Sequence, residues 1–219
     1  MTEIEKLKEQ PDLFLREDGL WWSKESTISL EFLQIRQEEI DTKIIPLIPE
    51  RRIVVQAGGN CGYVPKNLRR SFETVYTFEP IHSMFLALCL NNIDMYNTFK
   101  FQACLGKENT STNMMRYHNA HNGNDFPFAS GRFPIIKIDD LNLKYCDLIM
   151  LNIAGYEYYS LLGGQNTIEK HKPLLYLGRN FMPRTLGLPD FILDDKLKEW
   201  GYAEIAKIGL FDHIYQFQK

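Results

Sequence analysis

The order of apolar and polar positions divides the chain into two parts near residue 50. In residues 1–50, apolar side chains recur irregularly every three or four positions among many charged ones, and this pattern predicts an N-terminal helical cap. From Arg52 onward, short apolar runs alternate with stretches of helical periodicity. Such alternation is typical of β-α-β units and predicts a parallel sheet with right-handed crossovers. We therefore expect a cap over residues 1–50 and one α/β domain over residues 51–219.

The elements of the second part follow from the same pattern. The predicted strands are residues 53–55, 74–78, 99–104, 110–117, 134–138, 147–153 and 174–177, and the predicted helices are residues 63–72, 81–93, 157–171 and 189–200. Two further strands, 202–207 and 212–217, end the chain as a hairpin. This hairpin would place an antiparallel C-terminal strand on a doubly wound, mostly parallel sheet.

A glycine-rich turn after the first buried strand is the most informative segment. It contains Gly58 and Gly59, and the next apolar run ends in Glu79 at the distance of about 20 residues typical of a nucleoside-binding β-α-β unit. Glycines let the backbone approach a ligand, and the following helix points free N–H groups into the same space. The Glu79 carboxylate can accept both ribose hydroxyls. The alternative is a tight structural turn beside an exposed acid.

The turn does not match a dinucleotide fingerprint. A G-x-G-x-x-G pattern that begins at Gly58 requires glycine where this chain has Asn60 and Tyr63. A nicotinamide- or flavin-dependent oxidoreductase is therefore disfavoured.

Charge and cysteine usage narrow the class further. The 25 Lys and Arg against 28 Asp and Glu give a net charge of −3, which predicts no nucleic-acid partner. The 4 cysteines are too widely spaced to indicate a zinc site or a disulfide framework, so we expect a reducing environment. No apolar run approaches the roughly 18 residues of a membrane span, and the N-terminus lacks an apolar leader core. The sequence predicts a soluble, cytoplasmic protein without a membrane partner.

Several short motifs, in a fixed order, carry a family resemblance. They are Val55–Gly62, Phe78-Glu79-Pro80, Leu105-Gly106, Ile138–Leu141, and Leu151–Glu157 with Leu162-Gly163-Gly164. Together they resemble the FkbM-like family of S-adenosylmethionine-dependent methyltransferases over about residues 52–180. The resemblance implies a class I methyltransferase, Rossmann-like fold with S-adenosylmethionine as cofactor. It also implies methyl transfer to a hydroxyl of a sugar, a glycan or a small metabolite.

The resemblance further implies which residues hold the cofactor. The methionine part would lie among Gly58, Gly59, Asn60 and Gly62, the ribose at Glu79, and the adenine at Ala103 and Cys104. Gln56, Pro80 and Asn152 complete the expected cofactor-binding set.

Several acids of the family pattern are replaced. The family motif D-V-G-A-N begins with Asp, and this chain has Gln56 there. The motif D-V-E-G-x-E has two acids where this chain has Asn152 and Ala154. After the fifth strand, where the family usually has Glu, this chain has Gly178. Fewer carboxylates near a positively charged sulfonium weaken its binding or positioning. Three explanations stay open: an active subgroup with its chemistry elsewhere, a catalytically impaired or non-catalytic cofactor-binding or interaction module, or acids replaced by design.

A hydroxyl acceptor benefits from a general base that titrates near neutral pH, which favours histidine. His118 and His121 in the polar insert 107–132 are the first candidates, although a solvated loop is the commoner role for such residues. Glu157, the acid retained from the fourth-strand motif, is the third candidate. Asp139 and Asp140 have no evident third ligand, so we predict no metal. The acceptor and the oligomeric state, a homo-oligomer included, stay open.

Overall fold

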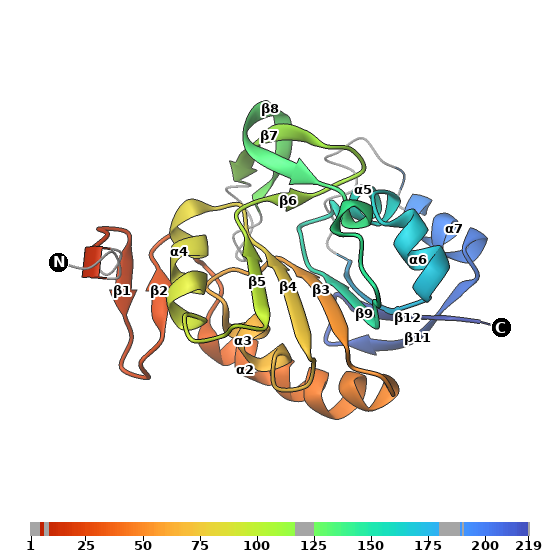
Figure 1. The fold of residues 1–219 in the computed structure, drawn as a ribbon, viewed down its shortest axis with the longest axis horizontal. Coiled ribbons are helices and arrows are strands. Elements are labelled where there is room, and N and C mark those ends of the chain that lie inside the picture. Colours follow the sequence, from red (N-terminus) through yellow and green to blue (C-terminus); the bar gives the residue numbers. More distant parts are fainter. Residues whose placement is uncertain (1–4, 7–8, 117–124, 180–188, 190, 219) are drawn as a thin grey trace.

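The computed structural model describes residues 5–6, 9–116, 125–179, 189 and 191–218. A seven-stranded sheet forms its centre, in the order β11-β12-β10-β9-β3-β4-β5 (Figure 1). The strands are β3 (Ile53–Ala57), β4 (Thr74–Phe78), β5 (Thr98–Phe101), β9 (Leu148–Leu151), β10 (Leu174–Gly178), β11 (Tyr202–Ile208) and β12 (Asp212–Phe217).

The strand directions confirm the predicted sheet. Strands β5, β4, β3, β9 and β10 are paired in parallel, whereas β12 runs antiparallel to both β10 and β11. The chain leaves β3 toward β4 on one side and later returns to place β9 on the other side. Ligands of doubly wound proteins bind outside the carboxyl ends of the strands at such a reversal of strand order.

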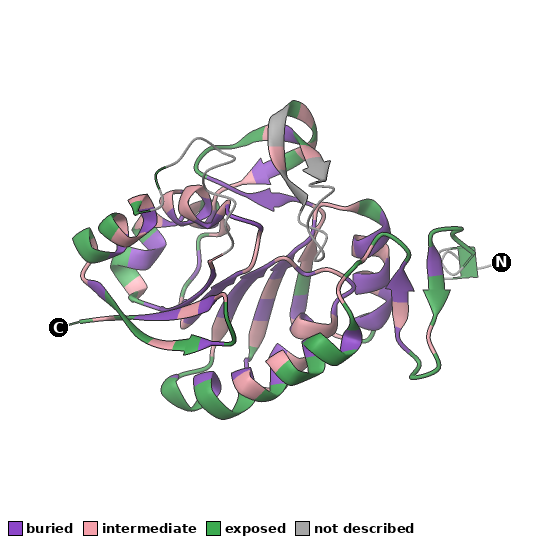
Figure 2. Ribbon diagram, turned by 180° about the vertical axis from the view of Figure 1, so that it is seen from behind, coloured by how far each residue is buried: buried purple, intermediate pink, exposed green. Residues whose placement is uncertain are grey.

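Helices cover both faces of this sheet. They are α2 (Leu30–Glu39), α3 (Tyr63–Leu68), α4 (His82–Asn91), α5 (Glu157–Leu162), α6 (Gln165–His171) and α7 (Ile192–Glu199). Short turns η1 (Ile40–Ile44) and η2 (Ile45–Leu47) continue α2, and η3 (Ile138–Leu141) precedes β9. Val54 packs with Ile40 and Ile44 on one face, and its neighbour Val55 packs with Leu161 and Ile168 on the other. Both faces of the central strands are largely buried (Figure 2), so these strands are mostly apolar and do not alternate, with Gln56 and Thr77 as buried polar exceptions.

A short hairpin replaces helix in part of the N-terminal region. The helical prediction for residues 1–50 is correct for α2 and wrong for residues 13–23, where β1 (Leu13–Leu15) pairs with β2 (Trp21–Ser23). Leu13 and Trp22 pack against α4, so tertiary burial selects the hairpin over helical spacing. The division of the chain at residue 50 stays a prediction.

A second, three-stranded sheet stands over the carboxyl ends of the central strands (Figure 1). It contains β6 (Cys104–Leu105), β7 (Thr110–Arg116) and β8 (Asp125–Ile136), in the order β6-β8-β7. The predicted strand at 110–117 is confirmed as β7, and the strand predicted at 99–104 is divided between β5 and β6.

The predicted helix over residues 157–171 is also divided, into α5 and α6. A side chain at Gly163 would collide with the backbone carbonyl of Gly106, so this close contact fixes the break. Over the described ranges, no helix combines the length and the apolar character needed to cross a bilayer.

Candidate functional site

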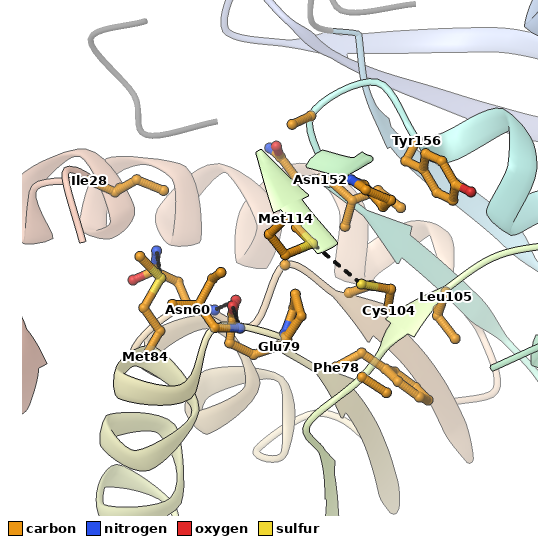
Figure 3. A pocket seen from close by; sticks show the side chains of 18 residues that line it. Ile28, Asn60, Phe78, Glu79, Met84, Cys104, Leu105, Met114, Asn152 and Tyr156 are labelled. Atoms are coloured by element: carbon orange, nitrogen blue, oxygen red, sulfur yellow. Dashed lines mark hydrogen bonds between the residues drawn. The ribbon is translucent and has the colours of Figure 1, made fainter. Parts of the chain in front are cut away.

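A pocket opens at the carboxyl ends of β3, β4 and β9, where the order of the strands reverses (Figure 3). Its volume is about 730 Å³, counting space open to solvent. The lining includes residues that follow each strand (Gly58, Asn60, Glu79, Pro80, Asn152, Ile153, Ala154), a segment around β6 (Ala103, Cys104, Leu105), and Ile28, Met84, Met114, Pro127 and Tyr156. The sheet, the second sheet and the N-terminal region all contribute to it.

The glycine turn forms one wall of the pocket. Gly58 has a φ of 84°, in the left-handed region that favours glycine. The backbone N–H groups of Gly58 and Gly59 both donate to the Phe78 carbonyl, at 3.1 and 3.0 Å. A Cβ at Gly58 would collide with the carbonyl oxygen of Asn152, and one at Gly59 would lie 2.5 Å from Leu88 Cδ1. The chain's own packing therefore requires glycine at residue 58, where the contact is with backbone, whereas the contact at residue 59 is with side chains.

Two backbone amides orient the Glu79 carboxylate. Asn60 N–H donates to its Oε2 at 2.8 Å, and Ile81 N–H donates to its Oε1 at 2.9 Å. Glu79 is 5% exposed and lines the pocket. Because both oxygens are fixed at the wall, the carboxylate is preorganised to accept hydroxyl protons from a ligand.

The N-terminal region braces the same turn. Ser26 Oγ donates to Asn60 Oδ1 at 2.9 Å, and Ser23 N–H donates to Cys61 Sγ at 3.3 Å. Ile28 lines the pocket directly. Ser23, Ser26 and Ile28 of the predicted cap are thus part of the site or of its support, a role that the sequence did not predict for these residues.

The opposite side of the pocket is apolar. Phe78 stacks on Phe101 with ring centroids 4.7 Å apart, and Cys104 Sγ lies 3.7 Å from Met114 Sδ (Figure 3). Burial raises the pKa of the Cys104 thiol to about 12. A neutral thiol is a poor nucleophile, so Cys104 contributes an apolar surface rather than covalent chemistry.

Two departures from the family pattern lie side by side. Asn152 Nδ2 donates to Asp212 Oδ1 at 3.2 Å, which turns the amide toward the end of β10. A Cβ at Gly178 would lie only 3.1 Å from Asn152 Cγ and Oδ1. The absence of a side chain at residue 178 therefore leaves room for the observed position of Asn152.

Glu157 lies behind the pocket wall. Its side chain is 2% exposed, and its Oε1 accepts the N–H of Ile153 at 2.8 Å. Burial raises the pKa of Glu157 to about 7, although hydrogen bonds from the backbone of its own loop act in the opposite direction. Between Ile153 and Glu157, the residues Ala154 and Gly155 have φ values of 56° and 93°, in the left-handed region. The Glu157 carboxyl group therefore stabilises a loop with an uncommon backbone conformation.

A pH-dependent contribution to stability follows from Glu157. Because folding raises its pKa from 4.5 to about 7, the folded protein binds this proton more tightly, and stability falls as pH rises through this interval. The neutral variant Glu157→Gln should therefore exceed the natural protein in stability by about 2–3 kcal/mol at pH 8 and lose this advantage at pH 4.5. Urea unfolding at the two pH values measures the effect. Glu169→Gln, an exposed charge removal, is the control, and equal pH slopes for Glu157→Gln and the natural protein would contradict the prediction.

The structure brings together most of the predicted cofactor-binding residues. Those lining the pocket are Gly58, Asn60, Glu79, Pro80, Ala103, Cys104 and Asn152. Gln56 and Gly59 line an adjacent pocket on the other side of the turn, and Gly62 lines neither pocket. His118 and His121 lie outside the described residues. Asp139 accepts hydrogen bonds from Thr167 N–H and Oγ1 at 2.8 and 2.7 Å, so it caps α6.

Sequence reasoning missed several lining residues: Ile28, Met84, Met114 and Pro127. Met84 had a usable signal, because it lies at the start of the helix that follows Glu79. Ile28, Met114 and Pro127 come from segments whose docking over the site is a tertiary property.

No family model matches the sequence, and no curated protein sequence matches it. The fold, however, is similar to solved structures. An FkbM methyltransferase from Methylobacillus flagellatus KT has a TM-score of 0.53 at 17% identity, over 76% of this chain and 44% of that chain. This chain thus spans less than half the length of that protein.

Two other structures resemble the chain over most of their length. The ribosomal protein L11 methylase from Lactobacillus delbrueckii subsp. bulgaricus has a TM-score of 0.52 at 10% identity, over 88% of this chain and 81% of that one. The precorrin 8w decarboxylase from Methanobacterium thermoautotrophicum has a TM-score of 0.50 at 10% identity, over 93% and 99%. Together with the strand order, these similarities establish the class I methyltransferase, Rossmann-like fold. A decarboxylase shares it, so the reaction must be argued from the site.

Proposed function

We propose that this protein is an S-adenosylmethionine-dependent methyltransferase that acts on a hydroxyl of a sugar, a glycan or a small metabolite. The observation that carries the proposal is the Glu79 carboxylate, which two backbone amides hold at the pocket wall beside the glycine turn. The motifs that resemble the FkbM-like family support the same assignment. We also retain the prediction that the protein is cytoplasmic.

The residues present suit this cofactor. Glu79 would accept the ribose hydroxyls, and the apolar side around Ala103 and Cys104 would accept the adenine. Gly58, Asn60 and Asn152 would face the methionine part. When bound, S-adenosylmethionine supplies an electrophilic methyl group on a positively charged sulfur.

In this proposal the protein accelerates transfer mainly by positioning the reactants. The ionisable side chains among the described lining residues are Glu79, Cys104 and Tyr156. Burial raises the pKa values of Cys104 and Tyr156, so neither titrates near neutral pH as a general base should. His118 and His121 stay proposed bases. Glu157 would act as a positioning residue for the wall of the pocket.

A second candidate is a non-catalytic module that binds the cofactor or a protein partner. The observation that favours it is that the described lining residues include no histidine, and that burial raises the pKa values of Cys104 and Tyr156 above their usual range. Transfer of a labelled methyl group to any carbohydrate acceptor would exclude this candidate.

Calorimetry with S-adenosylmethionine and S-adenosylhomocysteine tests the proposed function. We expect both to bind, and we expect adenosine to bind more tightly than 2′-deoxyadenosine because only adenosine offers Glu79 two ribose hydroxyls. NAD serves as the control ligand, since the turn lacks the dinucleotide glycines. If neither S-adenosyl compound binds at millimolar concentration, the proposal is wrong.

A further inference from the structure

A second pocket lies on the other side of the glycine turn. It is enclosed by the sheet and by α2 and α3, and its volume is about 530 Å³, counting space open to solvent. The two pockets share Ile28, Gly58, Asn60 and Asn152 as lining residues. Gly58 and the Asn152 carbonyl are packed against each other, so a thin backbone partition separates the pockets. A molecule in one pocket would therefore lie close to a molecule in the other.

The inner wall of this second pocket carries polar groups on the central strands. The polar residues are Gln56 on β3 and Tyr176 on β10; each is a register neighbour of the apolar Met150 on β9, and all three line the pocket. Gln56 Oε1 accepts the hydroxyl of Thr77 at 2.6 Å, which leaves the NH₂ of this amide as its donor group. Polar side chains at this depth are unusual in a parallel sheet, where both faces are normally apolar.

The hydroxyl of Tyr176 is the clearest sign of a ligand. Tyr176 is 1% exposed, and within the described residues its hydroxyl has no hydrogen bond of normal geometry, although Asp212 lies near it. A buried hydroxyl without a partner is costly, so such groups call for an explanation. A ligand oxygen in the pocket would supply the missing partner.

A cation completes the set of donors. Arg36 on α2 lines the pocket, and its NH2 group lies 2.6 Å from Oδ2 of the buried Asp212. Asp212 also accepts the Asn152 amide, so one carboxylate holds both Arg36 and the partition residue in place. A guanidinium has five N–H donors, of which this ion pair engages a part. Arg36, Gln56 and Tyr176 thus offer more donors than acceptors.

A surplus of donors beside a cation selects a ligand rich in acceptor oxygens, and a carboxylate above all. We propose that the second pocket binds the carboxylate end of a hydroxylated acid, such as a uronic acid, next to Arg36 and Tyr176. The acid would lie beside the ligand of the first pocket, on the other side of the Gly58 and Asn152 partition, so this site goes beyond the proposed function and leaves the methyl acceptor as proposed above.

Glucuronate is the probe, measured by calorimetry on the full chain. Glucuronate should bind about tenfold more tightly than its neutral isostere glucuronamide and than glucose, because only the acid offers an anionic oxygen to Arg36. This comparison needs no variant. Equal affinities for the three compounds, or no binding of glucuronate at 50 mM, would overturn the proposal.

The variant Tyr176→Phe removes the hydroxyl and keeps the ring. It should weaken glucuronate binding about fivefold to tenfold and leave S-adenosylhomocysteine binding unchanged. The matched control is Tyr202→Phe, which removes a buried hydroxyl that donates to the Pro173 carbonyl at 2.9 Å, away from both pockets. This control should leave glucuronate binding unchanged.

The outcomes separate this inference from the proposed function. Weaker binding of S-adenosylhomocysteine to Tyr176→Phe, with glucuronate unaffected, would assign the second pocket to the nucleoside ligand and overturn the inference. If S-adenosylhomocysteine fails to bind the natural protein while glucuronate binds in a Tyr176-dependent manner, the acid site stands and the methyltransferase proposal fails.

Discussion

Replacing Glu79 with glutamine should weaken S-adenosylhomocysteine binding by about 100-fold. The glutamine keeps the size of the side chain, but one oxygen becomes an NH₂ group that cannot accept the Asn60 or Ile81 amide. The same group cannot accept a ribose hydroxyl. Loss of charged hydrogen bonds worth about 1.5–3 kcal/mol each gives a change of this size. Calorimetry with the natural protein and the variant measures it.

Glu73→Gln is the matched control for this prediction. Glu73 is exposed and immediately precedes β4, whereas Glu79 follows the end of the same strand. The control should bind S-adenosylhomocysteine as the natural protein does. Urea unfolding checks that Glu79→Gln is folded. A folded variant that binds within about twofold of the natural protein would remove Glu79 from the binding site and with it the main support for the proposed function.

The second large effect is expected at Gly58. An alanine there must adopt a φ of 84°, which costs about 1–2 kcal/mol, and its Cβ would collide with the carbonyl of Asn152. That carbonyl belongs to the segment after β9, which cannot move without disturbing the pairing of β9 with β3. Gly58→Ala should therefore lose at least about 3 kcal/mol of unfolding free energy. Urea unfolding provides the measurement.

The variant Gly19→Ala distinguishes the cost of a positive φ from the cost of the steric collision in Gly58→Ala. Gly19 has a φ of 79°, close to that of Gly58, but a Cβ there would meet no atom within 4 Å. It should show the backbone cost alone, about 1–2 kcal/mol. Equal losses for the two variants would mean that the partition between the pockets yields to a methyl group, and that its tight packing does not matter for stability.

Much of the fold could be predicted because its signals are local. Each central strand is a short apolar run, and each is followed by a turn or a helix with its own spacing. Gly58 and Glu79 were predicted as site residues for the same reason, since parallel strands bring their carboxyl ends to one edge. The β1–β2 hairpin was not predicted, because Phe14 and Leu15 are exposed and hide the alternation expected of a strand.

The remaining parts of the site depend on contacts between distant segments. Ile28 and Met114 reach the pocket only because the N-terminal region and the second sheet dock over it. Glu157, in contrast, was predicted as a site residue but does not line the pocket. Its motif suggested a group that faces the substrate, but the backbone of its own loop binds the carboxyl group behind the wall. Sequence spacing places a residue on an element, whereas the direction of its side chain depends on the packing around it.

The contact between Asn152 and Gly178 constrains how the missing acids could return. The Cβ atom of any side chain at residue 178 would lie close to the Asn152 amide. A Gly178→Glu substitution alone would therefore introduce a steric contact in addition to the new carboxylate. The two positions are therefore coupled. An Asp at residue 152 has the same size as Asn152 and keeps this contact, so any side chain at residue 178 requires the residue 152 side chain to shift by a few tenths of an ångström, and a loss of activity in the single substitution at 178 would not by itself report on the need for a carboxylate there.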